Sequence, residues 1–479
     1  MKIKRLPQKI LLSLLALLHL PFLFEAFWYD EAAVLANAKI VSVSEYFHGL
    51  NWLQTIPFGF FLLVKNFISF EHGVVIGRIL SLLFLIATVI LIDREYLARL
   101  NNQALSYVAI AILTINSFSL RYATDVKPYT LEMLLSVSLL ICAKKNKLLM
   151  LILLSFLAPM FSSTAFIVGF SALSIYGIKY REKKYLAPAS IIVLMMLVVS
   201  RLVPSHTKYI MSTEWFGDSS PNIFAGVRSF IGGIFWLPTA GTGWLTDDLS
   251  TNHSFKYELS ILFFLIASFM IVFRQLRNND FHVLVLSGVI LVTLNILRFL
   301  PAAGRLIQGF AILFSLLLVN SLDTFKNKKF QTVILSALVF ASIFNNYSMK
   351  ITSFTPMVTI ESISIKKTIY SNLETAPEIQ YGASRQAMIM NPNILSNSKS
   401  GKLEGCRSEI LYQGDRYYLR VDINSEVPKL NGFIYTSISP GLGYYQASEQ
   451  LLIRQNPNAK KMLECIYQYR NPERESATR

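Results

Sequence analysis

Two adjacent carboxylates, Asp30 and Glu31, follow directly on the first apolar run of the chain and on the aromatic pair Trp28-Tyr29. Tryptophan and tyrosine favour the membrane–water interface, so this pair predicts that both carboxylates lie at a bilayer surface. An ionisable group at that depth is costly and is a functional-site hypothesis by default. A carboxylate held there can act as general base toward a hydroxyl, although Asp30 could also simply cap a helix beginning near Ala32.

A second charged cluster, which contains Arg121, Asp125, Lys127 and Tyr129, lies in a turn between two later apolar runs. Arginine and lysine recognise phosphate through charge-assisted hydrogen bonds. Arg121 and Lys127 are therefore candidate phosphate ligands, and Asp125 is a candidate second acid. The alternative is a turn whose long side chains snorkel toward water and form a local ion pair. Pro128 suits the first turn of the helix that follows.

Two further arginines are candidates for binding an anion. Arg305 opens a helix after Pro301 and Gly304, where a guanidinium and free helix N–H groups together form an anion site; interfacial anchoring is the alternative. Arg78 lies in the second apolar run near its predicted outer end, and a buried arginine there requires a carboxylate or a phosphate. No P-loop, dinucleotide fingerprint, HExxH or CxxC pattern occurs in the sequence.

The elements that must position these side chains are apolar helices. Apolar residues make up 53% of the 479 residues and charged residues only 15%. The apolar residues fall in runs of roughly 15 to 20, the length that spans a bilayer core as a helix. We therefore predict an α-helical polytopic membrane protein with about eleven transmembrane helices. They are expected at 10–27, 74–92, 104–120, 128–143, 148–161, 164–178, 185–203, 259–273, 281–297, 306–322 and 330–347.

The net charge of +16 fits membrane topology better than nucleic-acid binding. With the N-terminus in the cytoplasm, every predicted cytoplasmic loop is basic, as the positive-inside rule requires. The odd number of helices then places the C-terminus outside, and no nucleic-acid partner is expected. The predicted location is the inner (plasma) membrane of the cell. The cytoplasmic cations are Arg94, Arg99, Lys144, Lys145, Lys147, Lys179, Arg181, Lys183, Lys184, Arg274, Arg277, Lys326, Lys328 and Lys329.

Two domains are predicted. Residues 1–347 form the transmembrane domain, which carries two long outer loops at 28–73 and 204–258. The stretch 58–70 of the first loop is too short to span and is expected to lie in the interface as a helix. Residues 348–479 are polar and form a small extracytoplasmic α/β domain.

The C-terminal domain shows strand and disulfide signals. Strand-like runs at 409–412 and 417–423 flank Gln413-Gly414-Asp415, which predicts a β-hairpin. Cys406 and Cys465 suffice for one disulfide if the domain is extracytoplasmic.

These motifs follow one another in a set order and all lie on the predicted outer side of the membrane. In both respects the chain resembles the GT-C class of integral-membrane glycosyltransferases. That class includes the protein O-mannosyltransferases, the lipid A aminoarabinose transferases and related bacterial sugar transferases. The likeness extends to about residue 320. It rests on Asp30-Glu31 after the first helix, the 54–57 stretch, Gly77-Arg78 in the second helix, the 121–129 turn and the 301–306 loop.

Enzymes of this class take a sugar from a polyprenyl phosphate on the outer face and pass it to an acceptor, usually with inversion. The resemblance implies that Asp30 is the catalytic general base, with Glu31 beside it. Asp125 matches a second acidic position that holds the acceptor or a divalent metal. Lysine and arginine side chains would stabilise the charge that develops on the leaving phosphate. The implied substrate-binding set is Arg78, Arg121, Lys127, Tyr129, Arg305 and Gln54.

The implied partners are a polyprenyl-phosphate sugar donor, a glycan, lipid or protein acceptor, and membrane lipid. No extended acidic motif accompanies the carboxylates, so a Mg or Mn ion, if one is used, would depend on Asp30 and Asp125. One alternative is a polysaccharide ligase or polymerase acting on polyprenyl-linked glycans through the 204–258 loop. Another is a transporter of lipid-linked substrates, which would place charges near the bilayer midplane and break helices in paired halves.

Overall fold

The structure is a computed structural model. It describes residues 8–24, 29–48, 50, 56–68, 70, 72–114, 117–162, 164–202, 266–297, 299–300, 307–325, 327, 331, 410–413, 416–420, 434–439 and 442–446. The chain divides into two compact units. The first unit comprises 1–23, 43–49 and 55–353, and the second comprises 24–42, 50–54 and 354–479.

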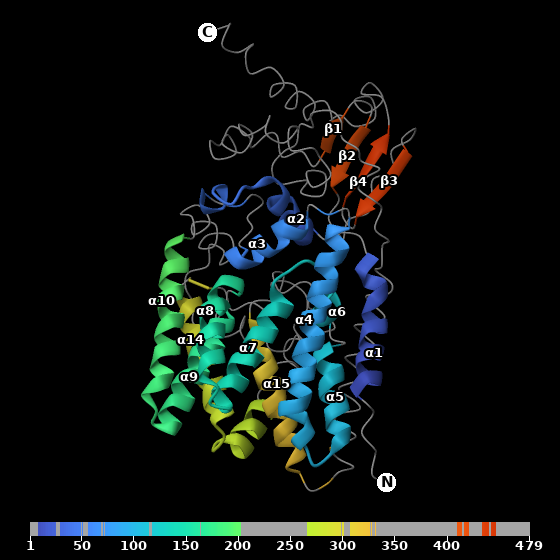
Figure 1. Ribbon diagram of the computed structural model, residues 1–479. Helices are drawn as coiled ribbons and strands as arrows, with labels where there is room; N and C mark the ends of the chain where they lie inside the picture. The colour runs from blue at the N-terminus through green and yellow to red at the C-terminus, as the bar shows by residue number, and fades with distance from the viewer. Residues whose placement is uncertain are drawn as a thin grey trace. The chain divides into compact units, whose positions relative to one another are not determined.

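The long helices of the first unit run side by side as a bundle (Figure 1). Helix α7 packs against α4, α8, α9 and α15, so it lies in the middle of the bundle. The long helices are α4 (Gly73–Glu95), α5 (Gln103–Thr114), α7 (Tyr129–Lys144), α8 (Leu148–Phe161), α9 (Ala165–Tyr180), α10 (Leu186–Leu202), α14 (Asn279–Ile296) and α15 (Gln308–Asp323).

Shorter helices complete the described part of this unit. An apolar helix at Ile266–Gln275 precedes α14. The others are α1 (Gln8–His19), η1 (Leu20–Phe24), η2 (Glu45–His48), α3 (Phe58–Phe67), η3 (Leu97–Arg99), α6 (Ser117–Tyr122) and η4 (Lys183–Tyr185).

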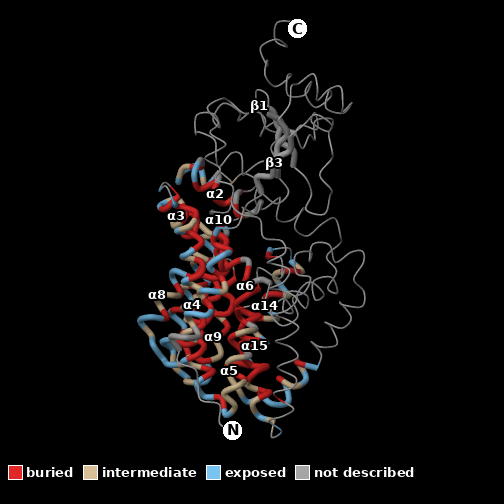
Figure 2. The backbone as a smooth tube through the Cα atoms, turned by 90° about the vertical axis from the view of Figure 1, so that its right-hand side faces the viewer, coloured by how far each residue is buried: buried red, intermediate tan, exposed pale blue. Residues whose placement is uncertain are grey.

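Buried apolar side chains of α4, α5, α7, α9, α14 and α15 form one continuous core. Figure 2 shows these buried positions gathered inside the bundle. Helices α15 and α7 approach closely where Gly309 faces Ser136: a Cβ atom on Gly309 would lie 2.2 Å from Ser136 Oγ and 2.8 Å from Ser136 Cβ. The absence of a side chain at 309 therefore allows this approach.

Many large apolar side chains point away from the core. Leu149 of α8 is 71% exposed, and Ile178 of α9 is 74% exposed. Exposed apolar side chains are costly in water when they gather into a large patch, and such patches are typical of surfaces that meet lipid or a partner. Among the residues that the structure describes, the helices at Gly73–Arg99 and Asn279–Ile296 are long and apolar enough to cross a membrane.

The helix boundaries follow the predicted spans closely in the middle of the chain, where α8 spans 148–161 as predicted. The first predicted span, 10–27, differs: α1 ends at His19 and a 3-10 turn containing Pro21 follows, since proline supplies no backbone N–H. The described residues of the third, 104–120, belong to α5 and α6. Most of 330–347 lies outside the described residues, so the number of eleven helices stays a prediction.

The described part of the second unit comprises α2 (Tyr29–Ile40) and a four-stranded sheet. All three strand pairs are antiparallel, in the order β1-β2-β4-β3. In the β1–β2 pair Gln413 lies opposite Arg416, which confirms the antiparallel pairing of the predicted hairpin, although Gln413 ends β1 and was predicted to lie in the turn. The α/β character of the whole C-terminal domain stays a prediction, and Cys406 and Cys465 lie outside the described residues. The strands are β1 (Ile410–Gln413), β2 (Arg416–Arg420), β3 (Ile434–Ser439) and β4 (Leu442–Gln446).

The close approach at Gly309 can be tested. We expect Gly309→Ala to destabilise the full chain by about 1–3 kcal/mol, because overpacking a fitted core costs that much, although alanine is the better helix former. Ser136→Gly removes the atoms that Gly309 faces, so the double variant should lose less stability than the two single variants together. Thermal unfolding of all four proteins in detergent gives the comparison. Additive effects would show that the two positions do not interact.

Candidate functional site

The turn between α6 and α7 is buried along its whole length. Asp125 is only 5% exposed and Lys127 only 4%, and the residues between Tyr122 and Tyr129 share this burial. A snorkelling lysine would keep its ammonium group in water. Snorkelling is therefore wrong for Lys127, whereas the local ion pair of that alternative stays untested, and the turn is an internal polar segment of the bundle.

Aromatic packing closes the two ends of the turn on each other. The rings of Tyr122 and Tyr129 lie with centroids 4.6 Å apart and planes at 73°, an edge-to-face arrangement. Such pairs add about 0.5–1.5 kcal/mol beyond the area that they bury. Within the turn, the backbone N–H of Lys127 donates to the Asp125 carbonyl oxygen at 2.9 Å. These two contacts fix the local backbone conformation of the turn that carries Asp125 and Lys127.

Helix α4 packs directly against the turn. The Ser81 hydroxyl donates to the Asp125 carbonyl oxygen at 2.8 Å and lies 3.2 Å from the carbonyl oxygen of Gly77. A Cβ atom on Gly77 would lie 2.9 Å from Val126 Cγ2 and 2.6 Å from a ring carbon of Phe67. The Gly77-Arg78 motif therefore has a packing reason: glycine lets the turn and α3 approach α4.

Arg78 is fully buried at 0% exposure. Its Nη1 atom donates to the Leu23 carbonyl oxygen at 2.8 Å, which ties α4 to the end of η1. Arg78 and Ser81 occupy neighbouring turns of α4, one residue and four residues after Gly77. The structure thus brings the helix that carries Arg78 together with the turn that carries Asp125 and Lys127. A buried guanidinium, ammonium and carboxylate are costly unless compensated, so this end of the bundle is a polar site.

A further buried carboxylate lies one turn into α7. Glu132 is 1% exposed, and the Thr164 hydroxyl, just before α9, donates to its Oε1 atom. Ser162 Oγ accepts from the backbone N–H groups of Thr164 and Ala165, at 3.1 and 2.8 Å. Sequence reasoning missed Ser81 and Thr164 as part of this polar region. The signal available in the sequence was a hydroxyl residue within or at the end of an apolar run, because a buried charge in such a run needs a hydrogen-bonding partner.

The Asp30-Glu31 pair lies inside a helix and not in a loop. Helix α2 begins at Tyr29, so both residues belong to its first turn, where carboxylates are favoured by the helix dipole. The alternative, in which Asp30 caps a helix that begins near Ala32, is therefore wrong. Glu31 is fully buried at 0% exposure. Asp30 is described only as a helical position.

The remaining predicted site residues are described less fully. Arg121 lies in α6 and is described only as a helical position. Gln54 and Arg305 lie outside the described residues, as does the 204–258 loop. Within the described ranges, no group of three or more histidine, cysteine, aspartate or glutamate residues is placed to hold a metal ion. Asp30 and Asp125 as metal ligands stay a prediction.

This arrangement holds a guanidinium, an ammonium and a carboxylate in a low-dielectric environment. Electrostatic interactions are stronger there than in water, so a single ammonium or guanidinium group contributes more to anion binding. Comparison of the chain with protein-family models and with curated protein sequences found no match.

The hydrogen bond that links α4 to the turn can be tested by mutation. Ser81→Ala removes the hydrogen bond to the Asp125 carbonyl oxygen, and we expect a loss of about 1 kcal/mol of stability. Ser315→Ala in α15 is the matched control, because its hydroxyl donates to the Ala311 carbonyl oxygen one turn earlier in the same helix. Denaturant or thermal unfolding of the full chain measures both. Equal losses in the two variants would mean that the Ser81 bond adds nothing beyond a local one.

Proposed function

We propose that this chain is a polyprenyl-phosphate-sugar-dependent glycosyltransferase of the GT-C type. It transfers a hexose or pentose from the lipid-linked donor to a glycan, lipid or protein acceptor on the outer face of the membrane. One observation carries this proposal: Arg78, Asp125 and Lys127 are buried in an apolar helical bundle, in the segments whose motifs resemble the GT-C class. Arg78 and Lys127 supply the positive charge that a phosphate-linked donor requires, and Asp125 supplies a carboxylate for the acceptor or a metal ion.

In the proposed reaction the acceptor oxygen attacks the anomeric carbon, and the bond between that carbon and the phosphate oxygen breaks. Asp30 takes the proton of the acceptor hydroxyl as general base, with Glu31 beside it. Lys127, Arg78, Arg121 and Arg305 stabilise the phosphate that leaves with the polyprenol. Gln54 and Tyr129 position the sugar, and Asp125 positions the acceptor or a Mg or Mn ion.

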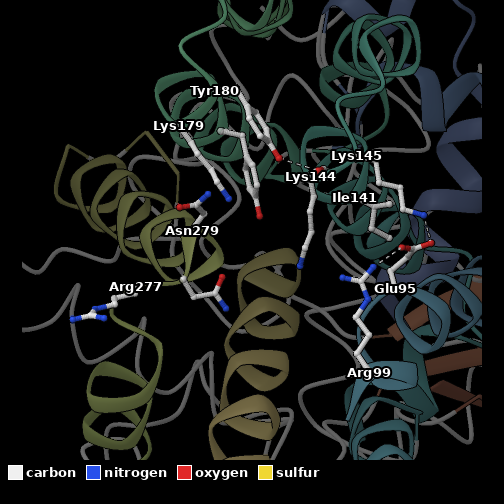
Figure 3. Close-up of a pocket in the computed structure, with 11 residues that line it drawn as sticks. Glu95, Arg99, Ile141, Lys144, Lys145, Lys179, Tyr180, Arg277 and Asn279 are labelled. Carbon is white, nitrogen blue, oxygen red and sulfur yellow. Dashed lines mark hydrogen bonds and ion pairs between the residues drawn. The ribbon is translucent and has the colours of Figure 1, made fainter.

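The proposed topology has about eleven transmembrane helices, a cytoplasmic N-terminus and an extracytoplasmic C-terminal α/β domain, in the inner membrane. Two observations support a membrane location. Two helices are of spanning length, and apolar side chains such as Leu149 of α8 and Ile178 of α9 are exposed. The loops that the positive-inside rule assigns to the cytoplasm include Lys144, Lys145 and Lys179, which lie at the same end of the bundle (Figure 3). That arrangement supports the proposed orientation.

The first test of the reaction is Asp30→Asn. We expect the transfer of radiolabelled sugar from a panel of polyprenyl-phosphate sugars into membrane products to fall about 10²–10⁴-fold, the usual contribution of a general base. Glu45→Gln is the control, because Glu45 is an exposed carboxylate of the same predicted outer segment. Equal transfer by the wild type and a well-expressed Asp30→Asn variant would remove Asp30 from the site and favour the ligase. Substrate flux without a covalent product would favour the transporter.

The second test concerns phosphate binding by the buried turn. We expect Lys127→Gln to lower kcat/KM for the polyprenyl-phosphate donor about 10²-fold, the magnitude seen when one preorganised donor is lost. Lys127→Arg should retain part of the activity, because a guanidinium keeps the charge although it differs in shape. Thermal unfolding of both variants serves as the folding control. The same catalytic loss in both, at unchanged stability, would show that the positive charge is not what the reaction needs.

A further inference from the structure

A basic pocket lies at the opposite end of the bundle from the α6–α7 turn, where α7 and α9 end and α14 begins (Figure 3). Its volume is about 370 Å³, within the range of about 300–1,000 Å³ that is typical of ligand sites. Five cations line it, against one lining carboxylate, Glu95. The cations come from four segments of the chain and are Arg99, Lys144, Lys145, Lys179 and Arg277.

Ion pairs hold three of these cations in place. Lys144 Nζ lies 3.1 Å from Oδ2 of Asp280, a carboxylate whose side chain is only 1% exposed, whereas the Lys144 side chain is 31% exposed. The Tyr176 hydroxyl donates to Asp280 Oδ1 at 2.5 Å. Glu95 pairs with Lys145 and lies 3.8 Å from Arg99 Nη2. These ion pairs restrict the three side chains, all of which line the pocket.

Two cations have no carboxylate partner among the residues that the structure describes. Lys179 extends toward the pocket, and its Nζ atom lies 5.5–5.8 Å from the ring centroids of Tyr176 and Tyr180. Arg277 lies at the edge of the pocket, and Figure 3 shows its side chain directed away from the other labelled residues. A neutral donor is also unused: Asn279 Nδ2 is buried and has no hydrogen-bond partner within the described part of the chain. Helix α14 begins at the same place, with Asn278 as its cap.

Basic loops alone do not explain this arrangement. The positive-inside rule and the helix dipole account for cations near the ends of α7 and α9, but neither gathers them around one cavity. Converging cations repel one another, and an anion with several acceptor oxygens would relieve that repulsion. We propose that this pocket binds a phosphate group, either the headgroup of an anionic phospholipid or a soluble phosphate. The site is separate from the proposed transfer site and does not depend on it.

The test uses the full chain purified in a neutral detergent. Phosphatidylglycerol, phosphatidylcholine and inorganic phosphate are titrated separately, and the rise in the thermal unfolding temperature is recorded. We expect Lys179→Gln combined with Arg277→Gln to raise the half-saturating concentration of the stabilising anion about tenfold or more. Lys147→Gln combined with Lys183→Gln is the matched control, because it removes two cations of the basic loops that do not line the pocket.

A rise with phosphatidylglycerol alone that is weakened only in the pocket variant supports a lipid headgroup. A rise with inorganic phosphate that is weakened in the same way supports a soluble phosphate. Equal responses to phosphatidylglycerol and phosphatidylcholine with none to phosphate, no response to any of the three, or equal weakening in the control variant would overturn the proposal.

Discussion

The burial of charge inside an apolar bundle is the constraint on which the rest of the described structure depends. Arg78, Asp125 and Lys127 are each at most 5% exposed, and the free energy cost of that burial requires compensation by neighbouring polar groups. The Leu23 carbonyl oxygen accepts from the Arg78 guanidinium, and contacts of the same region hold the bundle together. Arg78 ties α4 to η1, and Ser81 ties α4 to the turn before α7. The polar region is therefore also a structural junction.

Buried charge is also compensated at the other end of the bundle, but there the balance of charges differs. Asp280 is buried and compensated by Lys144 and Tyr176, but the surrounding cations outnumber the carboxylates. At the α6–α7 turn the charges are enclosed, whereas here they line an open pocket. The two ends therefore present their charges differently: one encloses them inside the bundle, and the other exposes them around a cavity.

Sequence patterns were informative where one physical signal dominated. The apolar run at 148–161 predicted α8 to the residue, because a long apolar segment in this composition has few alternatives to a helix. The pattern was less informative where two signals competed. Pro21 interrupts the first apolar run, and the aromatic pair before Asp30 hid the fact that α2 already begins at Tyr29. The aromatic pair Trp28-Tyr29 is compatible both with an interfacial segment and with the start of a helix. The sequence alone therefore did not show where α2 begins.

By itself, the sequence determined the helical class, the candidate charges near the ends of apolar runs and the basic loops, since these follow from hydropathy and charge along the chain. The tertiary structure alone decided which of those charges are buried and which lie together. Lys127 looks the same in sequence whether it snorkels or is enclosed, and only the packing of α4 against the turn distinguishes the two. Lys144, Lys179 and Arg277 are far apart along the chain, and only the folding of α7, α9 and α14 brings them to one pocket.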